Sequence, residues 1–297
     1  MKQEKFHIQL CPEYNCAVHH FKVVNPERVV IMIHGAVENG RIFYSKTGKG
    51  LAPFLCRNNS DVFVIDLPGR GDSKPHASEK LKHSQSQFVI RDFRKIIDTI
   101  QEKAVKGLPW HGVAHSWGGV IFAAGLMRYP EAKFNSLVFF GVKRRITIKT
   151  IRKYFYVDIF WKRIGTLLTK IYGYFPAKKW KLGSDDEPTD FALQTMDWVE
   201  QKNWIDHDDG FDYLQAAKKS GLPPILSLTG QADHTLGHPQ DVTLLINELQ
   251  VKEGEVIILG KDFGYHENYN HIDILTHQNA EKDGYQLAID WMRKYEN

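Results

Sequence analysis

Short runs of consecutive apolar residues recur along the chain, and between them apolar residues return every three or four positions. The first pattern is typical of parallel strands covered on both faces, and the second is typical of amphipathic helices. The strand-like runs are residues 28–33, 62–65, 110–115, 136–140, 224–228 and 255–259. The helical patterns are residues 45–57, 85–104, 117–128, 239–249 and 271–294. Strands that alternate with helices predict an α/β fold with a mostly parallel central sheet flanked by helices.

Two parts of the chain depart from this alternation. Residues 5–10 and 17–23 are predicted as antiparallel strands at one edge of the sheet. From about residue 143 to residue 221 no apolar strand run appears, and helix formers and aromatic residues dominate. We therefore predict an α/β core made of residues 1–142 and 222–297, with a helical cap, or lid, inserted at residues 143–221.

The composition is that of an ordinary globular protein: 297 residues, 42% hydrophobic and 25% charged, with a formal net charge of +4. These values exclude disordered and fibrous classes and give no reason to expect nucleic-acid binding. The first residues lack the apolar stretch of a secretory signal, and no apolar run is long enough to span a membrane. Three cysteines without metal-ligand spacing fit a reducing compartment. We expect a cytoplasmic protein without a metal site.

Ser116 lies in the segment Val-Ala-His-Ser-Trp-Gly-Gly of residues 113–119, between a predicted strand and a predicted helix. This context is the one that the G-x-S-x-G nucleophile turn requires. The turn exposes the serine Oγ at a helix N-terminus, where backbone N–H groups face a developing oxyanion. Ala114 stands where the motif has its first glycine, and alanine is also small. The alternative is a serine that only caps the helix.

The loop after the strand at 28–33 reads His34-Gly35-Ala36-Val37-Glu38-Asn39-Gly40-Arg41. A His-Gly pair at the carboxyl end of a strand allows close approach of backbone to a ligand. In the G-x-S-x-G context this loop supplies one of the two oxyanion N–H groups. We expect Ala36 to supply that group and Trp117, the residue after the serine, to supply the other. His34 is a candidate for contact with the substrate.

A nucleophilic serine needs a general base and an acid that orients the base, and here the chain order should be serine, acid, histidine. Asp233 follows the strand-like run 224–228 and is the candidate acid. The residues after the run 136–140 contain no carboxylate, which strengthens this choice. His271 follows the last strand and begins the terminal helical pattern, so it is the candidate base. His266, in a polar stretch of the same loop, is the alternative.

On these residues the chain resembles serine hydrolases of the α/β-hydrolase fold over nearly its whole length. The loop His34 to Arg41 resembles that of monoacylglycerol lipases, and residues 230–245 and 269–273 resemble acid lipases. The resemblance implies a triad of Ser116, Asp233 and His271 and hydrolysis of an apolar acyl ester through an acyl-enzyme, with no cofactor. An acyltransferase, a serine hydrolase that cleaves carbon–carbon or amide bonds, and a non-catalytic ligand-binding protein of this fold remain as alternatives.

The predicted cap carries most of the positive charge. Residues 143–181 contain twelve Lys or Arg and one acid, a net charge of about +11 that leaves about −7 for the rest of the chain. Apolar residues recur there at helical spacing, which predicts either a lid with a solvated basic face or a basic amphipathic surface that meets an anionic membrane or micelle. The candidate acyl-pocket residues in the lid are Phe155, Phe160 and Trp161. The candidate acidic partners of the basic residues are Asp185, Asp186, Glu187 and Asp190.

Overall fold

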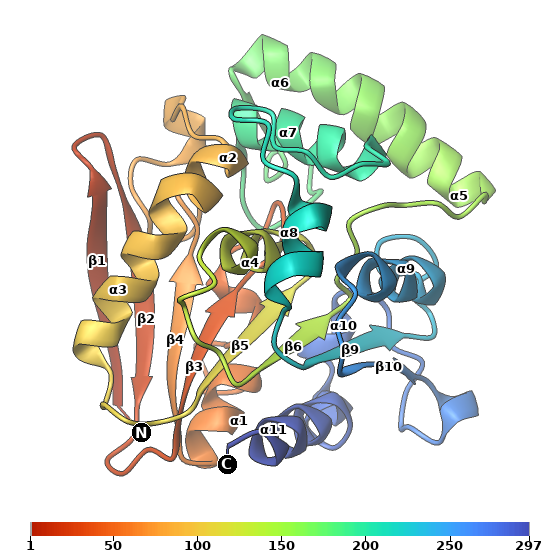
Figure 1. The fold of residues 1–297 in the computed structure, drawn as a ribbon. Coiled ribbons are helices and arrows are strands. Elements are labelled where there is room, and N and C mark those ends of the chain that lie inside the picture. Colours follow the sequence, from red (N-terminus) through yellow and green to blue (C-terminus); the bar gives the residue numbers. More distant parts are fainter. Residues whose placement is uncertain (1, 297) are drawn as a thin grey trace.

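The computed structural model describes residues 2–296, and an eight-stranded sheet forms its centre (Figure 1). The strands are β1 (Lys2–Cys11), β2 (Tyr14–Lys22), β3 (Arg28–Ile33), β4 (Ser60–Asp66), β5 (Trp110–His115), β6 (Ser136–Phe140), β9 (Ile225–Gly230) and β10 (Gly254–Leu259). They lie in the order β1-β2-β4-β3-β5-β6-β9-β10. β2 is antiparallel to both of its neighbours, and the other neighbours are parallel. The mostly parallel sheet that the sequence predicts is therefore confirmed.

Helices cover both faces of this sheet. Alternate side chains of β3 enter different apolar clusters, Ile31 in one and Val30 in the other, because successive side chains of a strand point to opposite faces. The first cluster is completed by α3 (Phe93–Lys103), α4 (Trp117–Arg128), α8 (Tyr213–Ser220) and α9 (Pro239–Leu249). The second is completed by α1 (Leu51–Arg57), α10 (Asp273–Thr276) and α11 (Gly284–Lys294). This cover on both faces explains the unbroken apolar runs of the inner strands.

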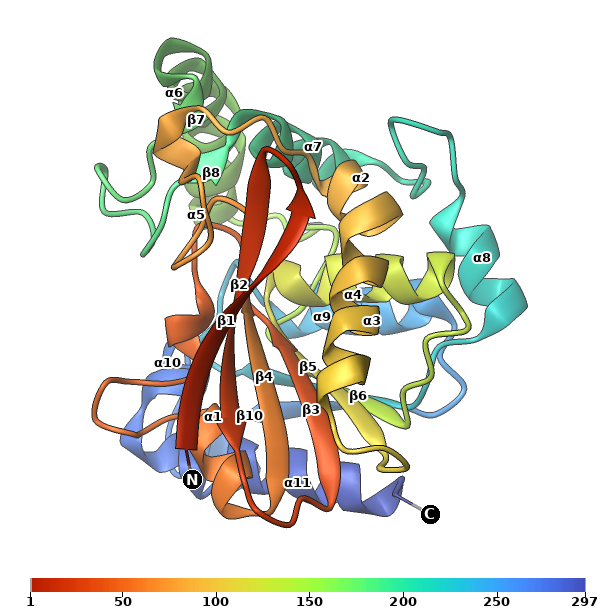
Figure 2. The same cartoon turned by 90° about the vertical axis from the view of Figure 1, so that its left-hand side faces the viewer.

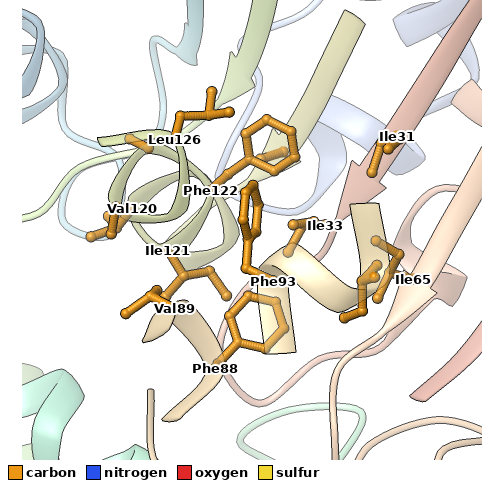
Figure 3. Close-up of a cluster of buried hydrophobic side chains, with 14 of the residues drawn as sticks. Ile31, Ile33, Ile65, Phe88, Val89, Phe93, Val120, Ile121, Phe122 and Leu126 are labelled. Atoms are coloured by element: carbon orange, nitrogen blue, oxygen red, sulfur yellow. The ribbon is translucent and has the colours of Figure 1, made fainter. Parts of the chain in front are cut away.

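The first cluster holds α4 firmly in the interior (Figure 3). The rings of Phe93 in α3 and Phe122 in α4 meet edge to face, with centroids 5.6 Å apart. Gly125 permits this approach, because a Cβ there would lie 2.6 Å from the Phe93 ring. α2 (Gln85–Gln87) and the π-helical turn η3 (Phe88–Asp92) lead into α3 and bring Phe88 to the same cluster. Ser116, the residue that precedes α4, therefore lies at the end of a buried helix.

Two of the predicted helices have different bounds in the structure. The pattern 45–57 becomes helical only at Leu51, because Gly48 and Gly50 adopt positive φ angles in the preceding loop. The pattern 271–294 divides into α10, the 3₁₀ turn η6 (Gln278–Glu281) and α11. It breaks at His277, which is extended, and again at Asp283, whose carboxylate accepts hydrogen bonds from His266 and Tyr269. The predicted helices 117–128 and 239–249 are confirmed at both ends.

The inserted segment lies over the carboxyl ends of the strands (Figures 1 and 2). It contains α5 (Ile151–Lys153), the π-helical segment η4 (Tyr154–Gly165), α6 (Thr166–Tyr172), β7 (Tyr174–Phe175), β8 (Glu187–Pro188) and α7 (Thr189–Glu200). α8, which is predicted as part of the cap, packs against the core helices α4 and α9, and its Tyr213 ring also meets Trp198 of α7. We therefore propose that the cap ends before α8.

The three cysteine thiols are free. Cys16 and Cys56 are buried, and burial raises the pKa of both thiols, so neither is an activated nucleophile. No helix among the described residues 2–296 combines the length and the apolar character that a membrane span requires.

Candidate active site

Ser116 occupies a strained turn between β5 and α4. Its φ and ψ angles are 49° and −127°, a conformation that residues with a side chain rarely adopt. The turn is possible because its neighbours are small. A Cβ at Gly118 would lie 2.3 Å from the carbonyl oxygen of His34, and one at Gly119 would lie 2.5 Å from Val142. Ala114 is fully buried in β5, so the sheet accommodates its methyl group where the motif has glycine.

Three predicted side chains from three separate loops form one hydrogen-bonded series. Nε2 of His271 lies 2.9 Å from Oγ of Ser116, and Nδ1 of the same ring lies 2.6 Å from Oδ2 of Asp233. Ser116, Asp233 and His271 are 7%, 4% and 9% exposed. The alternative base His266 is bound to Asp283 through its own Nδ1. The loop after β10 thus brings His271, and not His266, to the serine.

The charges around this series favour a neutral histidine beside an ionised carboxylate. Burial lowers the pKa of His271, and the carboxylate of Asp233 only partly opposes that shift. Burial by itself raises the pKa of Asp233, but the nearby His271, its hydrogen bond, the N–H of Gly237 and the charge of Lys143 outweigh burial and lower it to about 2. Nε2 of His271 is therefore available to accept the serine proton at neutral pH.

The loop that holds Ala36 is fixed on both sides of that residue. The N–H of Gly35 donates to Oε2 of Glu38 at 3.0 Å, and the N–H of Val37 donates to Glu187 of β8. The N–H of Ala36 lies between these two occupied groups. A Cβ at Gly35 would lie 2.8 Å from the Cβ of Ser116, so this loop passes directly beside the serine.

Trp117, the residue after the serine, is connected to the cap through its side chain. Its indole Nε1 donates to Oε1 of Gln85 at 3.0 Å, and Oγ1 of Thr195 in α7 donates to the same oxygen at 3.3 Å. The Trp117 backbone begins α4, where the N–H groups of a helix lack intrahelical partners. Ala36 and Trp117 stay candidates for the oxyanion N–H groups.

The four candidate substrate contacts differ in their surroundings. His34 is fully buried, and its ring engages backbone: Nε2 accepts the N–H of Leu67 at 3.0 Å, and Nδ1 lies 2.8 Å from the carbonyl oxygen of Gly35. Phe155 is 56% exposed on the lid. We therefore propose that the His34 ring holds the loop and that the Phe155 ring faces outward, so that neither contacts the substrate.

Trp161 has surroundings that suit an acyl pocket, and Phe160 precedes it in η4 with a partly buried side chain. The Trp161 ring packs on Phe175 with centroids 5.0 Å apart. Trp161 and Phe175 belong to a small apolar cluster that includes Val37, the neighbour of Ala36. The cluster thus extends from the cap to the loop beside Ser116, and we keep Phe160 and Trp161 as candidates.

His115, the residue before Ser116, forms an ion pair that the sequence did not predict. Nδ1 of His115 lies 2.8 Å from Oε2 of Glu38, and Nε2 of the same ring lies 2.9 Å from the backbone carbonyl oxygen of His271. Burial lowers the pKa of His115, but Glu38 outweighs burial and raises it. Burial raises the pKa of Glu38, but His115 outweighs burial and lowers it. Both ring nitrogens face oxygen atoms that accept hydrogen bonds, so the geometry favours donation from both.

Lys143, just after β6, is a second residue that sequence reasoning missed. It is 5% exposed, and burial lowers its pKa against the attraction of Asp233, Asp241 and Glu38. From the sequence alone, Lys143 counts as one of the basic residues of the cap and is not a candidate for the site. The signal available was a lysine directly after a buried strand, at the end of the sheet where the site lies.

One cluster outside this site has donor atoms close enough for a metal ion. The ligand atoms of His19, Asp66 and Asp72 all lie within 4.8 Å of one another, beside a polar cavity of about 290 Å³. Hydrogen bonds already occupy this cluster: Asp66 accepts from the backbone N–H groups of Gly40 and Asp72, and Lys5 donates to Asp72. These contacts hold the loop after β4 in place.

The comparisons with known proteins agree with this topology. A family model described as alpha/beta hydrolase fold matches residues 28–148. The chain has the α/β-hydrolase fold. This agrees with the resemblance in the sequence. No curated protein matches the chain.

Solved structures of this fold match nearly the whole chain. A soluble variant of monoglyceride lipase from Saccharomyces cerevisiae, solved with a substrate analogue, has a TM-score of 0.71 at 15% identity, covering 100% of this chain and 97% of that one. A lipase described as putative, from Acinetobacter baumannii, has a TM-score of 0.63 at 19% identity, covering 99% and 92%. An esterase from Exiguobacterium antarcticum has a TM-score of 0.62 at 15% identity, covering 97% and 98%. At these identities the likeness shows the fold.

Proposed function

We propose that this α/β hydrolase is a serine esterase or lipase that hydrolyses esters of apolar acyl groups. The observation that carries the proposal is the hydrogen-bonded series from Ser116 Oγ through His271 to Asp233, at a strained turn above the carboxyl end of β5. A nucleophile, a base and an orienting acid in this arrangement are what acyl transfer through a covalent intermediate requires.

In the first half of the proposed reaction, Oγ of Ser116 attacks the ester carbonyl carbon and its proton passes to Nε2 of His271. Asp233 holds the Nδ1 proton and stabilises the imidazolium that forms. The N–H groups of Ala36 and Trp117 stabilise the negative charge on the carbonyl oxygen. The tetrahedral intermediate then expels the alcohol, which takes the proton from Nε2, and the acyl group stays on Ser116.

In the second half, His271 removes a proton from a water molecule, whose oxygen attacks the acyl carbon. The ester bond to Ser116 breaks, and Oγ takes back the proton from Nε2. The carboxylic acid leaves and the starting protonation state returns. The low pKa that burial gives His271 keeps Nε2 unprotonated at the start of each half.

The apolar character of the acyl group is inferred from the cap. Trp161, Phe175 and Val37 form part of an apolar cluster that reaches the loop beside the serine. A ligand that enters there would bury apolar surface against the cap while its carbonyl lies at Ser116. The substrate class is therefore a small ester or lipid.

The test is a panel of p-nitrophenyl esters, from acetyl to long acyl chains, with the wild type and Ser116→Ala. We expect the variant to lose about 10³-fold or more of kcat/KM, because the nucleophile is absent. Ser227→Ala is the matched control: Ser227 is buried in β9, and its Oγ has no hydrogen-bond partner among the described residues. This variant should keep its activity.

A fluorophosphonate probe provides a readout that does not depend on the choice of ester. It should label the wild type at Ser116 and leave Ser116→Ala unlabelled. Full activity of Ser116→Ala, or no labelling of the wild type, would overturn the proposal. Labelling of Ser116 without hydrolysis of any ester would replace ester hydrolysis by acyl transfer or cleavage of another bond.

A further inference from the structure

The lid begins with one continuous helix, residues 151–172, made of α5, η4 and α6, which we call the lid helix. It forms the outermost layer of the cap (Figures 1 and 2). Its inner face is closely packed: Val157 and Leu168 are buried, and a Cβ at Gly165 would lie 3.2 Å from the Phe175 ring. The opposite face, which we call the outer lid face, lies away from the sheet.

The outer lid face exposes apolar side chains to an unusual degree. Ile151, Leu167 and Ile171 are 78%, 58% and 67% exposed. Of the twelve large apolar residues that are exposed in the described part of the chain, seven lie in or just after the lid helix. They are Ile151, Tyr154, Phe155, Ile164, Leu167, Ile171 and Trp180. A face that served only as a solvated lid surface would carry polar residues at these positions.

Basic side chains interleave with these apolar ones and extend into the loop that follows β7. Nζ of Lys179 lies 3.1 Å from the hydroxyl of Tyr172, which joins that loop to the end of the lid helix. Between residues 149 and 181, seven Lys and Arg side chains have no acidic partner within 4 Å among residues 2–296. They are Lys149, Arg152, Arg163, Lys170, Lys178, Lys179 and Lys181.

Two of the four acidic residues that follow point away from this surface, whereas Asp186 accepts the backbone N–H of Lys178 at 2.9 Å. Asp185 accepts hydrogen bonds from Asn39 and from the N–H of Gly71, and Glu187 pairs with Arg70. Both carboxylates are therefore directed to the core, contrary to the expected pairing with the basic segment. The lid-helix residues Arg152, Arg163 and Lys170 therefore keep their positive charge available to a partner.

We propose that the outer lid face, with the loop at residues 178–181, docks this protein on an anionic lipid surface. Aliphatic side chains interleaved with lysine and arginine suit the boundary between acyl chains and negative headgroups. Tyr154 and Trp180 are of the residue types that settle at that boundary. A nucleic acid would use the basic residues but would leave Ile151, Leu167 and Ile171 in water.

Docking in this way would hold the cap, and the candidate acyl cluster beneath it, against the layer that contains lipid esters. The inference goes beyond the proposed hydrolysis and does not depend on it, because no residue of the outer lid face belongs to the hydrogen-bonded series at Ser116. Binding can therefore be measured in the absence of any turnover.

The experiment is flotation of the purified full chain with vesicles of phosphatidylcholine alone and of phosphatidylcholine mixed with phosphatidylserine. Two variants test the two components: Leu167→Ser with Ile171→Ser for the apolar residues, and Lys178→Gln with Lys179→Gln and Lys181→Gln for the charge. Each should reduce the partition coefficient to the mixed vesicles by about tenfold or more. High salt should weaken wild-type binding.

The control variants remove exposed apolar or basic side chains at other places on the surface. Phe263→Ser removes another exposed apolar side chain, and Lys106→Gln with Lys218→Gln and Lys219→Gln removes the same charge from exposed sites on the core. Both should bind as the wild type does. All variants should keep their turnover of a water-soluble short-chain ester, which separates lost docking from misfolding.

Several results would overturn the proposal. These are no wild-type flotation with the mixed vesicles, equal flotation with both vesicle types, and unchanged binding by both lid variants. If the protein bound a DNA or RNA oligonucleotide but not the vesicles, the basic residues would be a nucleic-acid binding surface instead. A dimer that both lid variants dissociate, again without vesicle binding, would assign the apolar residues to a second copy of the chain.

Discussion

The carboxylate of Glu38 lies 2.8 Å from Nδ1 of His115, the residue immediately before the serine. Through its other nitrogen the His115 ring donates to the backbone of His271, and Glu38 also accepts the N–H of Gly35. One buried ion pair thus touches the loops that carry Gly35, Ser116 and His271. Its role is positioning, since neither side chain belongs to the hydrogen-bonded series of the candidate triad.

Glu38→Gln should weaken both stability and activity. Removing one member of a buried ion pair leaves the other charge uncompensated, at a cost of about 3–5 kcal/mol in unfolding free energy. Displacement of the loops that carry Gly35 and His271 should lower kcat/KM by up to about 10²-fold. Urea denaturation and ester kinetics measure the two effects. Glu102→Gln, at an exposed site on α3, should change neither quantity.

The pH dependence gives a more specific check of the same pair. The His115 pKa is raised, so its contribution to stability is complete below the ordinary value of 6.5 and is lost as pH rises through the folded value. The Glu38 pKa is lowered, so its contribution is complete above 4.5 and is lost as pH falls through the folded value. The stability difference between wild type and Glu38→Gln should peak between these limits. A difference that is flat with pH would contradict the ion pair.

Lys143→Met should raise the pKa of the base. The Lys143 ammonium group lies near the candidate triad and lowers the His271 pKa, as does the charged His115 ring, while Asp233 raises it. Without Lys143 the acidic limb of the kcat/KM profile should move to higher pH, whereas Lys143→Arg, which keeps the charge, should leave it in place. Because burial makes the charged lysine unfavourable, Lys143→Met should also unfold at a higher temperature at neutral pH. An unchanged acidic limb would exclude this electrostatic role.

Much of this fold is predictable because its inner elements carry local signals. The strand at 136–140 and the helices at 117–128 and 239–249 have the predicted bounds. Their residues are largely buried, and the last helix begins at Pro239, a residue type favoured at the first helical position. The candidate triad is predictable for a related reason. The carboxyl ends of parallel strands meet at one edge, so residues that follow β5, β9 and β10 come together.

The rest depends on contacts that no local pattern records. Glu38 and His115 lie 77 positions apart, and each looks like an ordinary loop or strand residue on its own. The last helical pattern breaks at His277 and at Asp283, and the Asp283 carboxylate binds His266 and Tyr269 from the preceding loop. The inward turn of Asp185 and Glu187 is equally a tertiary effect, because their partners come from the loops after β3 and β4.

The wild-type acidic limb should lie below pH 6.5, because burial lowers the pKa of His271 and a protonated ring cannot accept the serine proton. Asp233, with its pKa lowered to about 2, stays ionised through this range and fixes the proton on Nδ1. Asp233→Asn should therefore reduce kcat by about 10⁴-fold through the wrong tautomer. Asp290→Asn on α11 is the surface control. An acidic limb above 6.5, or a small effect of Asp233→Asn, would argue against these assignments.

The cap should be held to the core by the buried pair of Arg70 and Glu187. Both side chains are almost fully buried, and the guanidinium carbon also lies 4.0 Å from the centre of the Phe191 ring in α7. Arg70→Met and Glu187→Leu should each cost about 3–5 kcal/mol, whereas the double variant should cost less than their sum because it leaves no buried charge unpaired. Urea denaturation gives these values, and limited proteolysis shows whether cleavage of the single variants begins in the cap.

The exposed pair of Arg57 and Glu281, with side chains 48% and 51% exposed, provides the control cycle. Its coupling energy should stay within about 1 kcal/mol, since water screens both charges. If the effects at Arg70 and Glu187 are additive, the two side chains do not act as a pair. If proteolysis instead starts in the core, another contact holds the cap. The next contacts to test are the hydrogen bonds that Gln85 donates to Gln194 and accepts from Thr195.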